Sequence, residues 1–147
     1  MIKLKSNKNI QFLKHTADVK FRVRGKTLNS CFENASLAMF KSMYDGKVKS
    51  KIKKNIAVKG NDLESLMYNF LDELLFVFDT RDFILSKIKV KINKSDEKTE
   101  GLELNAKLDG DNVKTYEIGL IVKAVTYNSM FIKKSKDYWV AEVVLDV

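Results

Sequence analysis

The 147-residue sequence contains no proline, one histidine and one cysteine. A single cysteine, Cys31, cannot form an internal disulfide, which agrees with a reducing compartment. A structural zinc site needs about four nitrogen or sulfur ligands, so this class of site is nearly excluded. Cys31 falls on the apolar face of a predicted helix, and we therefore expect it in the core rather than in a nucleophilic role.

Glycine is also scarce, and its six residues are scattered, so the sequence has no Gly-rich phosphate-binding loop. No apolar run approaches the roughly 20 residues that a membrane-spanning helix needs. The basic N-terminus is not followed by a signal-type apolar stretch, and no nucleophile-elbow motif is present. We expect a cytoplasmic protein without membrane association. Its length suits a single domain, residues 1–147, and no Pro-rich or Gly-rich linker divides it.

Arginine is rare in a chain whose formal net charge is +8, because only Arg22, Arg24 and Arg81 are arginines among 27 basic residues. Two explanations of the charge compete. A basic surface attracts phosphate backbones or an acidic partner, whereas a lysine-rich chain can also reflect a biased genome or a warm habitat. Direct base recognition normally uses arginine forks and stacked aromatic rings. The second explanation is therefore favoured for most of the lysines.

Two segments carry apolar residues at helical spacing. Residues 27–44 predict one helix, with Thr27 as its N-cap. Asn61 and Asp62 provide the cap of a second helix that starts at residue 63. Residues 74–78 of this helix are apolar on nearly every side, so we expect it to be covered on more than one side. Two sheets, or one sheet and a neighbouring helix, satisfy that requirement.

The rest of the chain is mostly strand. Apolar residues alternate with basic ones over residues 19–24, which predicts a strand with one buried face. Strand, helix, strand, helix and then several strands indicate an α+β domain, with two helices packed against or between mostly antiparallel sheets. The other predicted strands are residues 52–58, 87–92, 102–108, 117–132 and 138–147, with turns at 95–98, 109–112 and 135–137.

Two carboxylates stand at opposite ends of the predicted β structure. Asp18 precedes the first strand, and Asp146 follows the apolar run of the last one. If these strands are neighbours, Asp18, Asp146 and the terminal carboxylate of Val147 could meet. Three oxygen-bearing acids suit a hard cation such as calcium or magnesium. From spacing alone, the ordinary interpretation of a turn aspartate and a strand-end carboxylate is favoured.

Short motifs along nearly the whole chain resemble the archease family and occur in the order typical of that family. Each motif is modest evidence, and together they identify the chain as archease-like. The matching segments are residues 15–19 (His-Thr-Ala-Asp-Val), 25–28 (Gly-Lys-Thr-Leu), 32–35 (Phe-Glu-Asn-Ala), 43–45 (Met-Tyr-Asp), 71–76 (Leu-Asp-Glu-Leu-Leu-Phe), 123–127 (Lys-Ala-Val-Thr-Tyr) and 145–147 (Leu-Asp-Val).

The resemblance implies a fold, a site and a function. The fold is α+β with helices between sheets. The site is a divalent metal centre formed by Asp18, Asp146 and the terminal carboxylate of Val147, with calcium expected and magnesium or manganese as alternatives. The implied function is non-catalytic. The protein would activate the GTP-dependent RNA ligase of the RtcB type in tRNA splicing, by promoting guanylylation and multiple turnover of the ligase. We expect a monomer that associates with tRNA only indirectly.

Four residues are secondary candidates. His15 either orients the metal site or caps a turn. Lys123 and Tyr127 fall on one strand face by period-two counting, and they either present a cation and a hydroxyl to the ligase or are a packed lysine stem and a core-edge tyrosine. Asn128 stands where the family usually has histidine. An asparagine side chain still offers a carbonyl oxygen to a hard cation.

Two other functions remain open. The same carboxylates could serve a metal-dependent phosphoryl-transfer or hydrolytic enzyme, although general bases are sparse. A basic RNA-binding module would bind tRNA directly with a steep salt dependence. The lysine rows Lys87, Lys89, Lys91 and Lys133, Lys134, Lys136 are expected to be solvated sheet faces, with the approach of one row to tRNA as the minor alternative.

Overall fold

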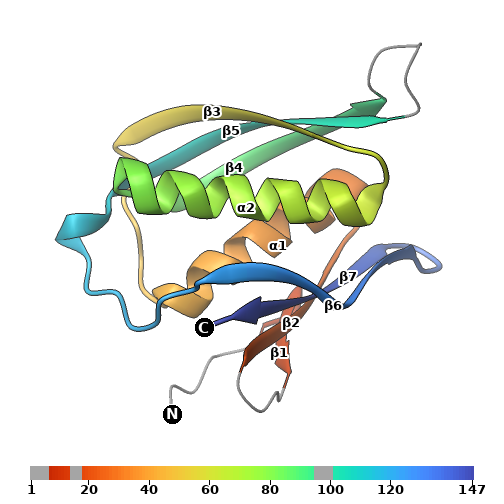
Figure 1. The fold of residues 1–147 in the computed structure, drawn as a ribbon, viewed down its shortest axis with the longest axis horizontal. Coiled ribbons are helices and arrows are strands. Elements are labelled where there is room, and N and C mark those ends of the chain that lie inside the picture. The colour runs from red at the N-terminus through yellow and green to blue at the C-terminus, as the bar shows by residue number, and fades with distance from the viewer. Residues whose placement is uncertain (1–6, 14–17, 95–100) are drawn as a thin grey trace.

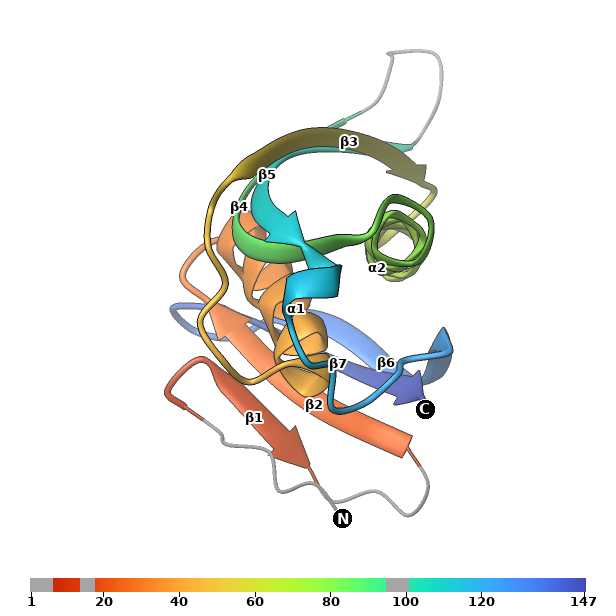
Figure 2. The same cartoon turned by 90° about the vertical axis from the view of Figure 1, so that its left-hand side faces the viewer.

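Two helices lie between two antiparallel sheets (Figure 1, Figure 2). The computed structural model describes residues 7–13, 18–94 and 101–147. The predicted α+β class is confirmed, and of the two arrangements expected for the helices the one between sheets is observed. The elements are β1 (Ile10–Leu13), β2 (Asp18–Gly25), α1 (Leu28–Met43), β3 (Ile52–Gly60), α2 (Leu63–Arg81), β4 (Phe83–Lys94), β5 (Leu102–Asn112), the short 3-10 helix η1 (Val113–Thr115), β6 (Ala124–Lys134) and β7 (Trp139–Asp146).

The chain crosses from one sheet to the other through its first helix. The four-stranded sheet has the order β1-β2-β7-β6, and the three-stranded sheet has the order β3-β5-β4. Helix α1 connects β2 in the first sheet to β3 in the second, and α2 connects β3 to β4. Both helices contact both sheets. This double cover buries Leu74, Leu75, Val77 and Phe78, whereas Phe76 in the same segment is 53% exposed.

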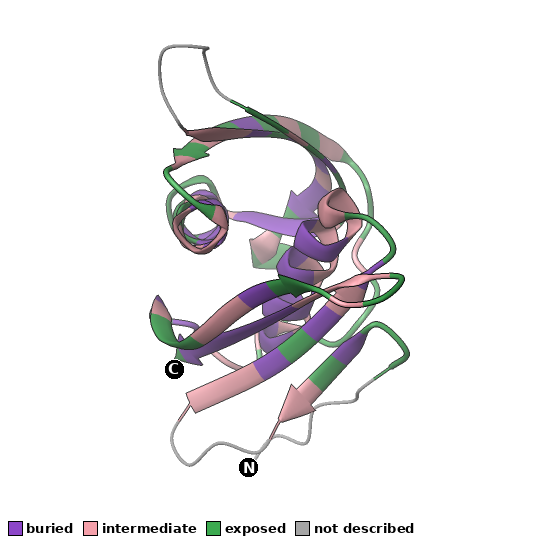
Figure 3. Ribbon diagram, turned by 90° about the vertical axis from the view of Figure 1, so that its right-hand side faces the viewer, coloured by how far each residue is buried: buried purple, intermediate pink, exposed green. Residues whose placement is uncertain are grey.

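The core lies where the helices meet the inner sheet faces. The rings of Phe32 in α1 and Phe70 in α2 are fully buried, with centroids 5.9 Å apart. Along β2, buried positions alternate with more exposed ones, as the predicted period of two requires (Figure 3). Cys31 is fully buried, and burial raises the pKa of its thiol to about 12. The prediction that Cys31 is a core residue is confirmed.

Both helices start at capping boxes, at the positions predicted. In α1, Thr27 accepts a hydrogen bond from the backbone N–H of Ser30 at 3.0 Å. In α2, the Asp62 carboxylate accepts from the backbone N–H of Ser65 at 2.7 Å, and the Ser65 hydroxyl accepts from the backbone N–H of Asp62 at 3.1 Å. The hydrogen bonds that Ser65 donates to the carboxylate hold the pKa of Asp62 below its usual value.

Asp62→Ala is expected to lower the free energy of unfolding by about 1 kcal/mol at neutral pH, because it removes the N-cap of α2. The native pKa of Asp62 is lowered, so its contribution is complete above the unfolded-state pKa and is lost as pH falls through the native pKa. Urea denaturation of wild type, Asp62→Ala and Asp62→Asn at neutral and acidic pH measures this. Asparagine caps without titrating, so Asp62→Asn should keep its stability at neutral pH. If the loss of unfolding free energy in Asp62→Ala is the same at acidic pH as at neutral pH, the ionised Asp62 carboxylate is not the cap.

The turn predicted at residues 109–112 is wrong. These residues continue β5, where Asp109 pairs with Lys53 and Asn112 pairs with Phe83. The buried Asp111 carboxylate is satisfied there, because it accepts hydrogen bonds from the Tyr116 hydroxyl at 2.7 Å and from the backbone N–H of Asn112 at 2.8 Å. The chain turns later, in η1.

The strand predicted over residues 117–132 starts only at Ala124. Residues 117–123 form no regular element, yet Val122 is buried and the backbone N–H of Gly119 donates to the carbonyl of Met43 at 2.9 Å. An irregular segment can therefore be apolar because it packs on the core. The short strand β1 was not predicted. Strands β4 and β5 pair as the expected hairpin, whose loop at 95–98 lies outside the described residues.

Candidate functional site

The two aspartates singled out in the sequence face each other in the four-stranded sheet. Strands β2 and β7 pair antiparallel, and the register places Asp18 directly opposite Asp146. Directly opposite side chains leave the same sheet face with Cβ atoms about 4.5–5.5 Å apart. Asp146 is exposed and Asp18 is half-buried. The predicted meeting of Asp18 and Asp146 required their strands to be neighbours. The pairing of β2 with β7 fulfils this requirement.

Strand alternation puts this aspartate pair on the outer face of the sheet. The preceding pair in the register, Val19 and Leu145, packs in or against the core, and the side chains of Asp18 and Asp146 therefore point the other way. On the β6 side, Asp146 is opposite Ala124, whose methyl group is too small to cover a carboxylate. The backbone N–H of Lys123 donates to the Asp146 carbonyl at 2.8 Å, which ties the end of β7 to the start of β6.

Val147 continues the chain directly after Asp146. Its side chain is partly buried against the core. This anchoring holds the main chain of Val147 at the end of the sheet, one residue from the aspartate pair. The main chain of Val147 thus lies beside the strand end that carries both side-chain carboxylates.

The donor set is made of oxygen atoms. Like charges directly opposite in a sheet repel each other, and a cation that binds both carboxylates converts this repulsion into attraction. Calcium and magnesium prefer oxygen ligands of this kind. No group of three or more His, Cys, Asp or Glu side chains suited to a metal exists in the part of the chain that the structure describes. The two carboxylates are oxygen donors of the kind that a hard cation binds, and within the described residues a carbonyl oxygen or water would have to complete the coordination.

The secondary candidates do not all gather at the aspartate pair. The ring of Tyr127 stacks on Tyr68 of α2, with centroids 4.5 Å apart and planes 7° apart. Burial together with the charges of Tyr68 and Asp62 raises the pKa of Tyr127. Lys123 is exposed and lies one residue before β6, so strand alternation does not define the direction of its side chain. His15 lies outside the described residues.

Asn128 lies in an irregular part of β6. The register with β7 shifts between Thr126 and Phe131, and Ser129 adopts a positive φ of 55°. Asn128 is exposed, and its backbone N–H donates to the Thr126 hydroxyl at 3.3 Å. Two regular strand residues, Val125 and Thr126, separate this bulge from Ala124 beside the aspartate pair.

The sequence did not point to Glu142, a buried acid on the same outer face. Its carboxylate accepts a hydrogen bond from Arg22 Nη2 at 2.7 Å and pairs with Lys20 Nζ at 3.3 Å. Buried charges require such partners. In the sequence, Glu142 differs from its neighbours only as one acid inside an otherwise apolar strand. Its partners on β2 are identified by the strand register.

Comparisons with known proteins agree over nearly the whole chain. The model of the Archease protein family matches residues 11–147. Protein archease of Methanosarcina acetivorans is 36% identical over 141 residues, which cover 95% of this chain and 97% of that protein. Protein archease of Pyrococcus abyssi is 37% identical, covering 95% and 99%.

Two solved structures share the fold. The solution structure of Methanobacterium thermoautotrophicum protein 1598 has a TM-score of 0.83 and 38% identity, and the match covers 95% of this chain and 99% of that one. The crystal structure of an archease and possible chaperone from Thermotoga maritima has a TM-score of 0.58 with full coverage of both chains, and at 14% identity it supports the fold alone. The chain described here belongs to the archease family.

Proposed function

We propose that this protein is an accessory factor that activates an RtcB-type RNA ligase by promoting guanylylation of the ligase. The observation that carries the proposal is the aspartate pair, Asp18 opposite Asp146, in a chain of the archease family. An accessory role agrees with the burial of Cys31, because burial raises the pKa of its thiol to about 12 and makes it a poor nucleophile at neutral pH.

The aspartate pair is proposed to hold a divalent cation together with the α-carboxylate of Val147. Calcium is the proposed ion because it accepts a mixed, irregular set of oxygen ligands, whereas magnesium demands near-ideal octahedral geometry. When bound, such an ion supplies positive charge that can stabilise phosphate oxygens. The protein's own contribution is to hold the two carboxylates on adjacent strands at an exposed end of the sheet, where a partner can reach them.

RNA joining with limiting ligase tests the accessory role. Ligase that is present well below the concentration of RNA ends should complete many more turnovers when this protein is added. Without ligase, the protein should neither consume GTP nor join RNA ends. Turnover by the protein alone would instead support the metal-dependent phosphoryl-transfer or hydrolytic enzyme. Unchanged ligation by a ligase from the same source would contradict activation.

Extending the chain by two glycines after Val147 is expected to reduce ligase stimulation strongly. The extension converts the α-carboxylate into a neutral amide, which removes one of the three proposed anionic ligands. The fold should persist, because the partly buried Val147 side chain is unchanged. Circular dichroism provides the folding control. Full stimulation by the folded, extended protein would remove Val147 from the proposed site.

A further inference from the structure

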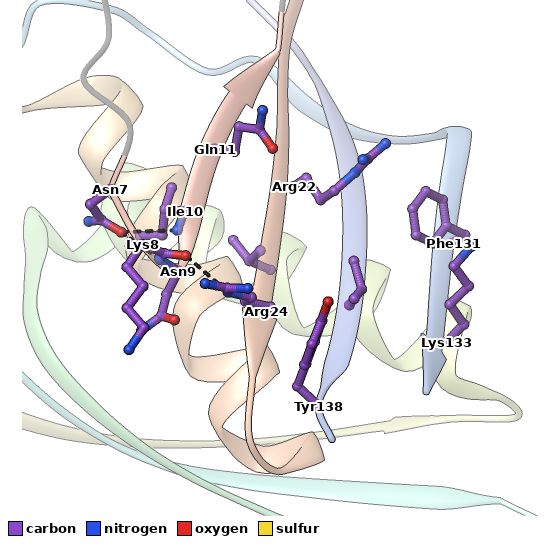
Figure 4. A pocket seen from close by; sticks show the side chains of 12 residues that line it. Asn7, Lys8, Asn9, Ile10, Gln11, Arg22, Arg24, Phe131, Lys133 and Tyr138 are labelled. Carbon is purple, nitrogen blue, oxygen red and sulfur yellow. Dashed lines mark hydrogen bonds between the residues drawn. The ribbon is translucent and has the colours of Figure 1, made fainter. Parts of the chain in front are cut away.

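A hollow lies on the outer face of the four-stranded sheet, away from the aspartate pair (Figure 4). Its volume is about 590 Å³, and it crosses all four strands, from β1 at one edge to β6 at the other. Three strand spacings of about 4.8 Å make this a span of roughly 14 Å. Arg22 and Arg24, which line the hollow, are four and six residues from Asp18 along β2, or about 13 and 20 Å. The hollow is therefore a separate site on the same sheet face.

The lining of the hollow is cationic. Four of its side chains carry positive charge, namely Lys8, Arg22, Arg24 and Lys133, and none of the lining residues is acidic. The carboxylate of Glu142 pairs with Arg22, but Glu142 is 4% exposed and does not line the hollow. Arg24 uses its Nε to donate to the Lys8 carbonyl at 3.0 Å, which positions its guanidinium without neutralising it. The hollow therefore selects an anionic ligand.

Aromatic rings stand beside these cations. Arg22 and Lys133 lie over the Phe131 ring, at 5.6 and 4.9 Å from its centroid. Arg24 lies over the Tyr138 ring at 5.4 Å. In Figure 4, Phe131 comes from β6 and Tyr138 from the turn before β7, so each aromatic ring has a cation next to it. An anionic ligand that stacks on such a ring places its negative charge next to a cation of the protein.

We propose that this hollow binds single-stranded RNA. Sheet surfaces that bind single strands combine cations for the backbone with aromatic rings for unstacked bases, and the lining has both. The amide side chains of Asn9 and Gln11 on β1 add hydrogen-bonding groups suited to base edges. A duplex keeps its bases stacked and offers only phosphates, and an acidic peptide has no bases to stack. This inference goes beyond the proposed function and needs no ligase to be tested.

Lys133 was expected to belong to a solvated sheet face, and its exposure confirms this. Lys133 also lies over Phe131 and lines the hollow. The row Lys87, Lys89 and Lys91 differs. These residues are exposed on β4, where Lys89 is directly opposite Lys107 and aromatic residues are absent from the adjacent register positions of the described strands. Lysines on that sheet therefore serve as a matched control.

Fluorescence anisotropy with a labelled oligouridylate of about 12 nucleotides, a length within the usual range for sheet-based binders, tests the proposal. Arg22 is already paired with Glu142, which leaves Lys8, Arg24 and Lys133 for phosphates. The logarithm of affinity should therefore fall with the logarithm of salt concentration with a slope near −2, from about 0.7 per phosphate contact. Arg24→Glu with Lys133→Glu should weaken binding by at least about tenfold. Lys53→Glu with Lys89→Glu changes net charge equally on the other sheet and should weaken binding by less than about threefold.

Phe131→Ala separates base stacking from simple phosphate attraction. It leaves the charge unchanged and should weaken binding to the oligouridylate by about tenfold, with little effect on duplex RNA of equal charge. Circular dichroism confirms folding of each variant. If both charge-reversal pairs lower the affinity for RNA equally, the binding results from overall charge and not from the hollow. That result would overturn the proposal. Equal affinity for duplex RNA, no effect of Phe131→Ala, or no binding at low salt would also overturn it. Ligase activation can fail without changing any of these outcomes.

Discussion

Asp146→Asn is expected to weaken calcium binding by at least about tenfold, because calcium affinity depends on the number of charged oxygen ligands. Without metal, the same substitution should leave stability unchanged or raise it by about 0.2–1 kcal/mol, since it removes repulsion between two directly opposite carboxylates. Asp18 and Asp146 form that pair in the β2–β7 register. A residue needed only for folding would behave differently, because its loss would destabilise the metal-free protein.

Calorimetric titration with calcium, and thermal denaturation with calcium or with chelator, measure both effects. At 100 times its dissociation constant, calcium should stabilise wild type by about 2.7 kcal/mol. With affinity at least about tenfold weaker, this stabilisation should fall to about 1.4 kcal/mol or less in Asp146→Asn at the same calcium concentration. Asp137→Asn is the matched control, because it removes one exposed charge from the turn at the opposite end of β7. Equal calcium responses of wild type and Asp146→Asn would exclude Asp146 as a ligand.

Phe70→Ala is expected to lower the free energy of unfolding by about 3–5 kcal/mol, the usual cost of removing a fully buried aromatic ring. Phe70 has no exposed surface, and its ring packs against Phe32, so it joins the two helices between the sheets. Small domains have a total stability of about 5–15 kcal/mol. The variant should therefore be close to unfolding at physiological temperature.

Phe76→Ala provides the comparison within the same helix. The side chain of Phe76 is 53% exposed, so its removal should change stability by no more than about 0.5 kcal/mol. Urea denaturation of the two variants measures the difference. Similar losses from both would contradict the burial of Phe70 and the exposure of Phe76 in the structure.

The elements with regular periodicity were predictable because one physical pattern determined each of them. Alternation over residues 19–24 corresponds to β2, whose inner side chains Phe21 and Val23 are buried. The N-caps at Thr27 and Asp62 were correct because short polar side chains satisfy the free N–H groups of a helix start. In these segments, local preference and tertiary packing agree.

Predictions from local sequence were wrong where a contact from a distant part of the chain, instead of a local hydrogen bond, satisfies the residue. Asp109, Gly110, Asp111 and Asn112 have strong turn preferences, but the Tyr116 hydroxyl satisfies Asp111 within the sheet. At Gly110, an added Cβ would lie 2.0 Å from the Ile84 carbonyl oxygen, so glycine is needed there for close strand packing rather than for a turn. Strand β1 was missed because four residues after a basic run are too few to establish a period of two.

The candidate site was predictable only in part. The residue types at positions 18 and 146 suggested oxygen ligands, but their meeting depended on which strands pair, and a single sequence does not determine pairing. The register supplies that link. The same limit applies to Glu142 and Arg22, which are 120 residues apart in sequence and form a hydrogen bond of 2.7 Å between adjacent strands.

The most direct test of the central claim is guanylylation of a ligase from the same source with limiting divalent metal, followed with labelled GTP. Wild type, Asp18→Ala, Asp146→Ala and the control Asp137→Asn would each be added after their folding is verified. Wild type and Asp137→Asn should accelerate guanylylation, and the two aspartate-pair variants should not. Equal acceleration by all four proteins would show that the aspartate pair has no part in activation. No acceleration by wild type would contradict the proposed function itself.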